Sequence, residues 1–126
     1  MKMIAFIAAG GAIGAVARHL LAAQVGGWLG HGFPWAILLV NVLGSLVLGA
    51  LVEVFALAWS PSQEVRAFIV VGVLGAFTTF SAFLMDVVLL YGRGQLLFAA
   101  LYIGASVALS ILAFFMAMQM TRTMLS

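Results

Sequence analysis

Residues 67–85 read AFIVVGVLGAFTTFSAFLM and contain no Asp, Glu, Lys or Arg. A membrane-spanning helix needs about 20 mostly apolar residues, so this stretch and its flanks predict a span near 65–90. Uncharged stretches recur at residues 3–17, between Arg18 and Glu53, and at residues 94–121. The chain therefore predicts one membrane domain over 1–126, with four spans near 3–22, 34–57, 65–90 and 95–120.

The composition supports an all-α integral membrane protein. Of 126 residues, 67% are apolar and 6% are charged, whereas a soluble domain has about 45–50% and ~25%. So short a chain cannot bury this much apolar surface in one core. A soluble monomeric enzyme and a disordered chain are thereby excluded, and the absence of cysteine excludes a disulfide scaffold.

Short polar or flexible segments separate the predicted spans. They are marked by Gly26, Gly27, Gly30, Gly32 and Pro34, by Ser60, Pro61 and Ser62, and by Gly92, Arg93 and Gly94. The first span also has features of a cleaved signal peptide, namely Lys2, the apolar stretch and the cleavage-like triplet Ala15-Val16-Ala17. Glycines at 10, 11 and 14 favour a permanent span, because small residues let membrane helices pack closely.

The five basic residues divide almost evenly between the two membrane ends. Lys2, Arg66 and Arg122 fall at one end, and Arg18 and Arg93 at the other. Because Lys and Arg normally mark the cytoplasmic side, such weak asymmetry indicates dual topology, with copies inserted both ways and paired as an antiparallel homodimer. A fixed orientation with little charge bias is the alternative. So few charges form no nucleic-acid-binding patch.

Polar groups at membrane depth are the candidate functional residues. Asn41 lies about two turns into the second span, where its amide either joins two helices or contacts a transported ion. In the third span, Gly75 and the pair Thr78–Thr79 disfavour a helix. A break there would free backbone groups for an ion site; the alternative is an unbroken helix whose threonine hydroxyls bond to their own carbonyls.

Aromatic and hydroxyl side chains complete the set. Phe80 and Phe83 share one helical face and either pack or present their positive ring edges to an anion. Tyr102, Ser106 and Ser110 recur every four residues on the fourth span, where they either hydrate an ion or bond within their own helix. His19 and His31 have no partner at metal-ligand spacing, so we interpret both as interfacial residues.

Taken together, the chain resembles the Fluc (CrcB-like) family of small fluoride channels. The resemblance is carried by Gly-Gly-Ala-Ile-Gly with Arg18-His19, by Asn41-Val-Leu-Gly44, by residues 75–83, and by the fourth-span hydroxyls. It covers nearly the whole chain. The chain departs from the family in two ways, and both leave fewer polar side chains along the expected ion path. Ala36-Ile37 stands where relatives often have Gly-Thr, and Ala82 and Phe114 stand where many have a hydroxyl.

The resemblance implies an antiparallel dual-topology homodimer in the cell inner membrane, with broken third helices crossing at its centre. One structural Na⁺ would be held there by the carbonyls of Gly75 and Thr78. It also implies two fluoride pathways, with Arg18 at the vestibule. The pathway residues would be Asn41, Thr79, Phe80, Ser81, Phe83, Tyr102, Ser106 and Ser110.

The implied function is passive, highly selective fluoride export, not an enzymatic activity. The main rival is a small dual-topology, proton-coupled multidrug exporter, which would need a membrane-embedded carboxylate. The chain has none in its first span, and Glu53 and Asp86 lie late in spans two and three. A non-transporting membrane scaffold is a third class of function.

Overall fold

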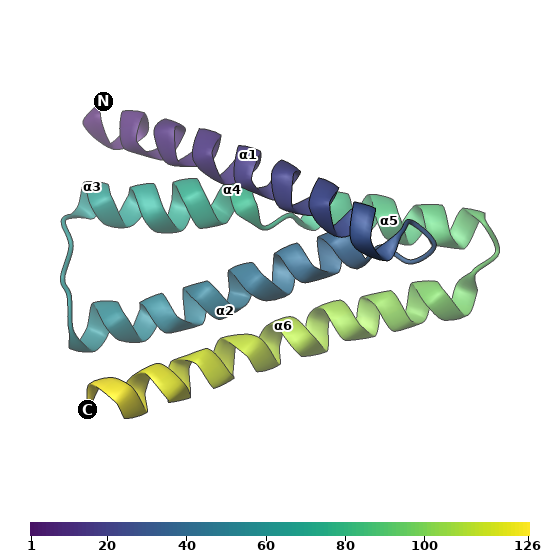
Figure 1. Ribbon diagram of the computed structural model, residues 1–126. Helices are drawn as coiled ribbons and strands as arrows, with labels where there is room; N and C mark the ends of the chain where they lie inside the picture. The colour runs from purple at the N-terminus through teal and green to yellow at the C-terminus, as the bar shows by residue number, and fades with distance from the viewer.

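The computed structural model describes residues 1–126 and contains helices without strands (Figure 1). Four long segments run back and forth, and the third is divided into four elements. The elements are α1 (Lys2–Leu29), α2 (Trp35–Leu57), α3 (Gln63–Arg66), the π-helix η1 (Ala67–Leu74), α4 (Gly75–Phe77), α5 (Phe80–Gly92) and α6 (Leu96–Leu125).

The four long segments are lengthy and apolar enough to cross a membrane. Only 19 of 126 residues are buried within the chain, and large apolar side chains point outward along every segment. A soluble monomeric protein rarely exposes so much contiguous apolar surface to water. The protein is therefore a multi-pass membrane protein whose outer surface suits lipid.

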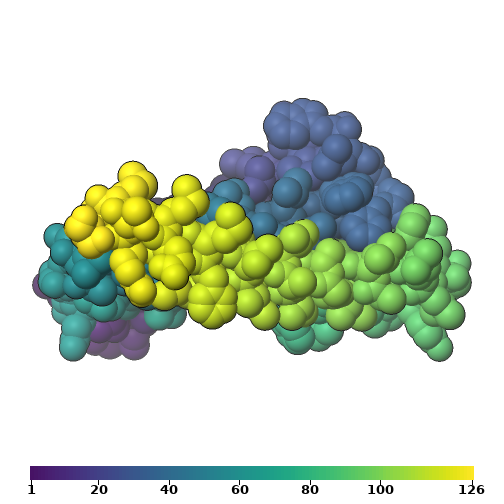
Figure 2. All heavy atoms as spheres, turned by 90° about the horizontal axis from the view of Figure 1, so that it is seen from below, coloured from purple at the N-terminus to yellow at the C-terminus, as the bar shows by residue number.

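The two termini lie at the same end of the bundle, together with α3 (Figure 1). Lys2, Arg66 and Arg122 belong to these end segments, whereas Arg93 follows α5 at the opposite end. Four of the five basic residues thus lie at the ends expected for them, whereas Arg18 lies within α1, eleven residues before the helix ends at Leu29. Seen from below, α6 runs along the length of one face of the molecule (Figure 2).

Close backbone contact joins α1 to the π-helix. The carbonyl oxygens of Phe68 and Val73 lie against Gly10 and Gly14 so tightly that a Cβ at either glycine would collide with them. The carbonyls are five residues apart and the glycines four. A π-helix repeats its hydrogen bonds at i→i+5 and an α-helix at i→i+4. One turn of η1 therefore matches one turn of α1, and each of the two carbonyls meets a glycine. The expected role in packing is confirmed for Gly10 and Gly14, whereas a Cβ at Gly11 would meet nothing within 4 Å.

Neighbouring helices α2 and α6 run in the same direction (Figure 1). Near their beginnings Leu38 packs with Tyr102, and near their ends Arg122 donates to the buried Glu53 at 2.6 Å. Asn41 and Ser45 therefore lie at the level of Ser106 and Ser110. This register decides which polar side chains meet.

The third segment is broken at Thr78–Thr79, as the resemblance implied; the residues alone had left an unbroken helix open. Both residues are extended, with φ, ψ of −81°, 156° and −151°, 123°. Gly75, in contrast, has helical dihedrals and lies inside the helical part. The β-branched pair with its polar hydroxyls, and not the glycine, occupies the break.

The first helix is longer than expected. It continues to Leu29 instead of ending near residue 22, so Gly26 and Gly27 lie in its last turns and the loop begins at Gly30. Gly30 has φ 78°, a left-handed conformation that favours glycine. The helix therefore stops where glycine permits the turn.

Candidate functional site

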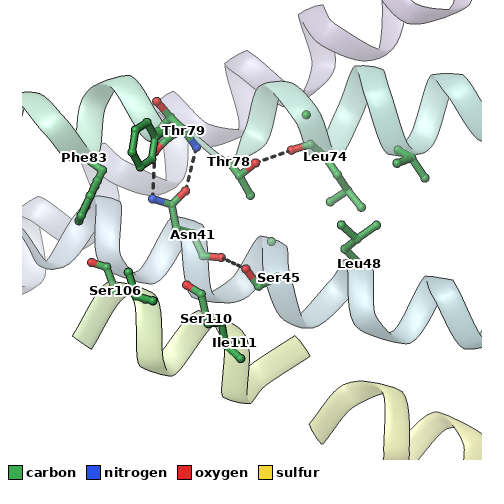
Figure 3. A pocket seen from close by; sticks show the side chains of 15 residues that line it. Asn41, Ser45, Leu48, Leu74, Thr78, Thr79, Phe83, Ser106, Ser110 and Ile111 are labelled. Atoms are coloured by element: carbon green, nitrogen blue, oxygen red, sulfur yellow. Dashed lines mark hydrogen bonds between the residues drawn. The ribbon is translucent and has the colours of Figure 1, made fainter. Parts of the chain in front are cut away.

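Asn41 fills the break in the third segment. Its Nδ2 donates to the carbonyl oxygen of Thr79 at 3.0 Å, and its Oδ1 accepts from the backbone N–H of Thr79 at 2.8 Å (Figure 3). Backbone groups at membrane depth must find partners within the protein. The Asn41 amide supplies both partners for one residue, so it joins α2 to the break.

Thr79 begins the second half of the broken segment. Its Oγ1 accepts from the backbone N–H of Ala82 at 3.1 Å and caps α5, and it lies 3.3 Å from the hydroxyl of Ser81. Thr78 instead donates from its hydroxyl back to the carbonyl oxygen of Leu74 at 3.0 Å. The predicted back-bonding thus occurs at Thr78, but it coexists with the break.

Because of these bonds, two carbonyl oxygens of the third segment do not accept their usual helical hydrogen bonds. In a continuous helix Gly75 would accept from the N–H of Thr79, and Thr78 from that of Ala82. Those two donors are used by Asn41 Oδ1 and Thr79 Oγ1 instead. The carbonyls of Gly75 and Thr78, which the resemblance implies as cation ligands, are therefore free of these helical bonds.

A cavity of about 410 Å³ lies beside the break, between α2, the third segment and α6 (Figure 3). We call it the central cavity. None of its lining side chains carries a charge, and its polar groups are amide, hydroxyl and backbone. It is lined by Asn41, Gly44, Ser45, Leu48, Val70, Leu74, Gly75, Thr78, Thr79, Phe80, Phe83, Ser106, Val107, Ser110 and Ile111.

One buried hydroxyl in this cavity has no partner. Ser106 is 6% exposed, and its Oγ makes no hydrogen bond. A buried polar atom without a partner is uncommon in folded proteins and calls for an explanation. Ser110, one turn further along α6, lines the same cavity. The intrahelical bonding that we considered for these serines is absent from the structure.

The predicted aromatic residues form a connected series. The ring centroids of Phe80 and Phe83 are 5.6 Å apart, those of Phe83 and Tyr102 5.1 Å, and those of Tyr102 and Phe33 5.7 Å. Phe83 is buried, whereas Phe80 is 71% exposed. Phe80 is thus available to a partner surface or to lipid, and Phe83 is held by the chain itself.

Tyr102 is fully buried, and its hydroxyl donates to Asp86 Oδ2 at 2.9 Å. The structure thus pairs Tyr102 with Asp86 outside the central cavity, instead of aligning it there with Ser106. Asp86 also lines a cavity of about 220 Å³ beside the loop that joins α1 to α2, together with His31, Phe33 and Arg93.

The remaining predicted site residues are dispersed. Ser81 is exposed on the first turn of α5. Arg18 is half-buried on α1 and lines neither of these two cavities. The structure therefore brings Asn41, Thr79, Phe80, Phe83, Ser106 and Ser110 together around one cavity.

Two residues of the site were missed in the sequence. Ser45 lines the central cavity one turn after Asn41, and the same four-residue spacing that marked Ser106 and Ser110 would have indicated it. Asp86 is the partner of Tyr102. Its acidic side chain within a span was noted, but only the fold shows which residue it meets.

Comparison with known proteins agrees with the sequence motifs. The family described as "CrcB-like protein, Camphor Resistance (CrcB)" matches residues 5–118. The chain is 50% identical over 123 residues to a protein of Rhodospirillum centenum named "Fluoride-specific ion channel FluC", with 98% of each chain covered. It is 47% identical over 116 residues to a protein of the same name from Nitrobacter winogradskyi, with 92% of each chain covered.

A protein from Chelativorans sp., also named "Fluoride-specific ion channel FluC", is 47% identical over 125 residues, which are 99% of this chain and 100% of that one. The similarity thus extends across all four long segments, and the resemblance drawn from the motifs is confirmed. This membrane protein belongs to the CrcB-like family.

Proposed function

We propose that this chain forms a passive, selective fluoride channel that exports fluoride from the cytoplasm. The central cavity is the observation that carries the proposal, because it places an amide, hydroxyls and phenyl rings together at membrane depth without any charged side chain. Uncharged donors and ring edges can replace part of an anion's hydration without a deep electrostatic trap. Relatives at 47–50% identity are named fluoride-specific ion channels.

Fluoride is the smallest halide and is strongly hydrated, so it needs several hydrogen-bond donors in a narrow route. The unpartnered hydroxyl of Ser106 and the hydroxyl of Ser110 are available as donors in the cavity. Asn41 has one N–H in use on Thr79, and its second N–H remains for the ion. A larger halide would fit poorly between the packed rings.

We further propose that two antiparallel copies complete the pathways. The rim of the central cavity includes exposed side chains, with Phe80 at 71%, Val107 at 53% and Ile111 at 52% exposure. A second copy placed on this face would enclose the cavity. The near balance of basic residues between the two ends favours opposite insertion of the copies, and two copies would give two equivalent pathways.

A structural Na⁺ at the centre of the dimer also fits the residues present. Hard cations prefer oxygen ligands, and the ends of broken membrane helices supply such carbonyls. The carbonyls of Gly75 and Thr78 are released from the helix ladder, and Gly75 is exposed on the chain. These carbonyls from both copies would hold the ion, whose charge would offset the exposed negative ends of the carbonyl dipoles.

The driving force in this proposal is the membrane potential. It contributes about 2.3 kcal/mol per elementary charge per 100 mV, and a negative cytoplasm directs an anion outward. The chain shows no nucleotide-binding motif, so the proposed transport uses no ATP. Its biological result would be resistance to environmental fluoride.

The alternative multidrug exporter is less well supported. Such a transporter needs a carboxylate that is free to exchange a proton and a cation. Glu53 is bonded to Arg122 and Asp86 to Tyr102, and neither lines the central cavity. A proton-coupled exchange site is therefore not assembled around this cavity.

The test uses purified protein in liposomes loaded with fluoride, and a fluoride electrode to follow efflux after a K⁺ ionophore is added. We expect rapid release from the wild type and strongly reduced release from Asn41→Ala and Phe80→Ile. Wild-type liposomes that retain fluoride like empty ones would contradict the proposed function. Unchanged release in both variants would instead remove these residues from the pathway.

A further inference from the structure

Ser45, which was not among the predicted site residues, lines the central cavity. Ser45 follows Asn41 by one turn on α2, and Ser110 follows Ser106 by one turn on α6. Because α2 and α6 run in the same direction, the two pairs lie at the same level along the central cavity (Figure 3). Four polar residues on two neighbouring helices thus line this cavity, and three of them were recognised in the sequence.

Ser45 also lines a second cavity. This side cavity measures about 230 Å³ and is lined by Ser45, Ser110, Ile111, Phe114 and Phe115. It shares Ser45, Ser110 and Ile111 with the central cavity. The two serines therefore stand where one cavity meets the other.

The hydroxyl series of α6 ends at this junction. The residue one turn beyond Ser110 is Phe114, which offers no hydrogen-bond donor. Within the side cavity, the polar side chains are Ser45 and Ser110 alone. An ion leaving Ser110 in this direction would find its next hydroxyl on α2, at Ser45.

The Ser45 hydroxyl can be released for this role. It donates to the carbonyl oxygen of Asn41 at 2.8 Å. In an α-helix that carbonyl also accepts the backbone N–H of the residue four positions on, which is Ser45 itself. Rotation of the side chain would free the hydroxyl proton for an anion and leave the carbonyl with a helical partner. Hydrogen bonds to charged groups are stronger than neutral ones, which favours the exchange.

We propose that Ser45 contacts fluoride directly and passes it, together with Ser110, between the central cavity and the side cavity. This inference rests on the proposed fluoride conduction and adds a donor that the sequence motifs did not include. The pathway would then use α2 at two successive turns, Asn41 and Ser45, instead of following α6 alone.

The first experiment compares fluoride efflux for Ser45→Ala, Ser45→Thr and the wild type. Loss of a hydrogen bond to a charged group predicts at least about a tenfold lower rate for Ser45→Ala, whereas Ser45→Thr keeps the hydroxyl and should stay within about threefold of the wild type. Thr123→Val is the matched control, because Thr123 makes the same type of back-bond, to Gln119 at 2.9 Å, at an exposed site. It should not change efflux.

A second experiment tests the location of Ser45 without depending on the stability of the alanine variant. The chain contains no cysteine, so Ser45→Cys carries a single thiol. Methyl methanethiosulfonate, which is small and neutral, should modify this thiol and stop fluoride efflux. The same reagent on Thr123→Cys should leave efflux unchanged.

The outcomes separate this inference from the proposed function. Wild-type efflux combined with an unaffected Ser45→Ala, or with an unmodified or still conducting Ser45→Cys, would overturn the role of Ser45 and leave the channel proposal intact. Absence of fluoride efflux from the wild type would overturn the channel proposal itself. Loss of efflux in Ser45→Ala with rescue by Ser45→Thr, and block of modified Ser45→Cys, would establish the contact.

Discussion

The side-chain amide of Asn41 bonds both the N–H and the carbonyl of Thr79, at 2.8 Å and 3.0 Å, across 38 positions of sequence. A break in a membrane helix leaves polar backbone groups that lipid cannot satisfy. One asparagine therefore stabilises the break and at the same time holds it beside the central cavity. The two interpretations of Asn41, a helix-joining residue and an ion-contacting residue, are compatible in one side chain.

Replacing Asn41 should destabilise the fold as well as reduce conduction. In Asn41→Leu, both backbone groups of Thr79 lose their partner, and each buried unsatisfied group costs about 1–3 kcal/mol. We expect a clearly lower melting temperature in detergent, followed by tryptophan fluorescence. Leu43→Ala, on an exposed part of the same helix, is the control. Equal melting temperatures for Asn41→Leu and the wild type would show that the amide is not needed at the break.

The cap of α5 depends on Thr79 and not on Thr78. Loss of an N-cap side chain costs about 0.5–2 kcal/mol, so Thr79→Val should lower the melting temperature. Thr78→Val removes only a back-bond to Leu74 and should be almost neutral. The prediction fails if the two variants melt alike or if Thr78→Val is the less stable one.

Small residues at the α1–η1 contact should be intolerant of even one added carbon. A Cβ at Gly14 would collide with the Val73 carbonyl, whereas a Cβ at Gly11 meets nothing within 4 Å. Gly14→Ala should therefore reduce the yield of folded protein and the melting temperature. Gly11→Ala should match the wild type in the same size-exclusion and melting measurements. A tolerant Gly14 would mean that the two helices lie further apart.

The Glu53–Arg122 pair joins the ends of α2 and α6. The Glu53 side chain is 6% exposed and that of Arg122 is 53% exposed. Removing the cation in Arg122→Gln leaves a buried carboxylate without its partner, which is more damaging than replacing both groups by apolar ones. We expect the melting temperature to fall in Arg122→Gln and to recover in the double variant Glu53→Leu/Arg122→Leu. A double variant less stable than Arg122→Gln would be inconsistent with this account.

Much of the architecture could be predicted from the sequence because lipid imposes a simple rule. Long uncharged stretches identify the spans. The Thr78–Thr79 pair leaves both a break and a continuous helix open, and the resemblance to the channel family favours the break. The π-helical register of residues 67–74 could not be predicted, because it depends on how the carbonyls of Phe68 and Val73 meet Gly10 and Gly14. Tertiary contact here decides the local structure.

Six of the predicted pathway residues line the central cavity, but their pairings could not be predicted. Asn41, Ser106 and Ser110 are conspicuous because polar side chains are rare in a span. Their partners depend on the register between α2 and α6, which no local pattern encodes. For this reason the bond between Tyr102 and Asp86 was not expected. Ser45 was overlooked although its four-residue spacing from Asn41 indicated it.

The central claim is that this chain conducts fluoride and excludes larger halides. The most direct test measures fluoride and chloride efflux side by side, with ion-selective electrodes, from liposomes containing the wild-type protein. The account predicts rapid fluoride release and chloride release no faster than from protein-free liposomes. Chloride efflux comparable to fluoride efflux would contradict it.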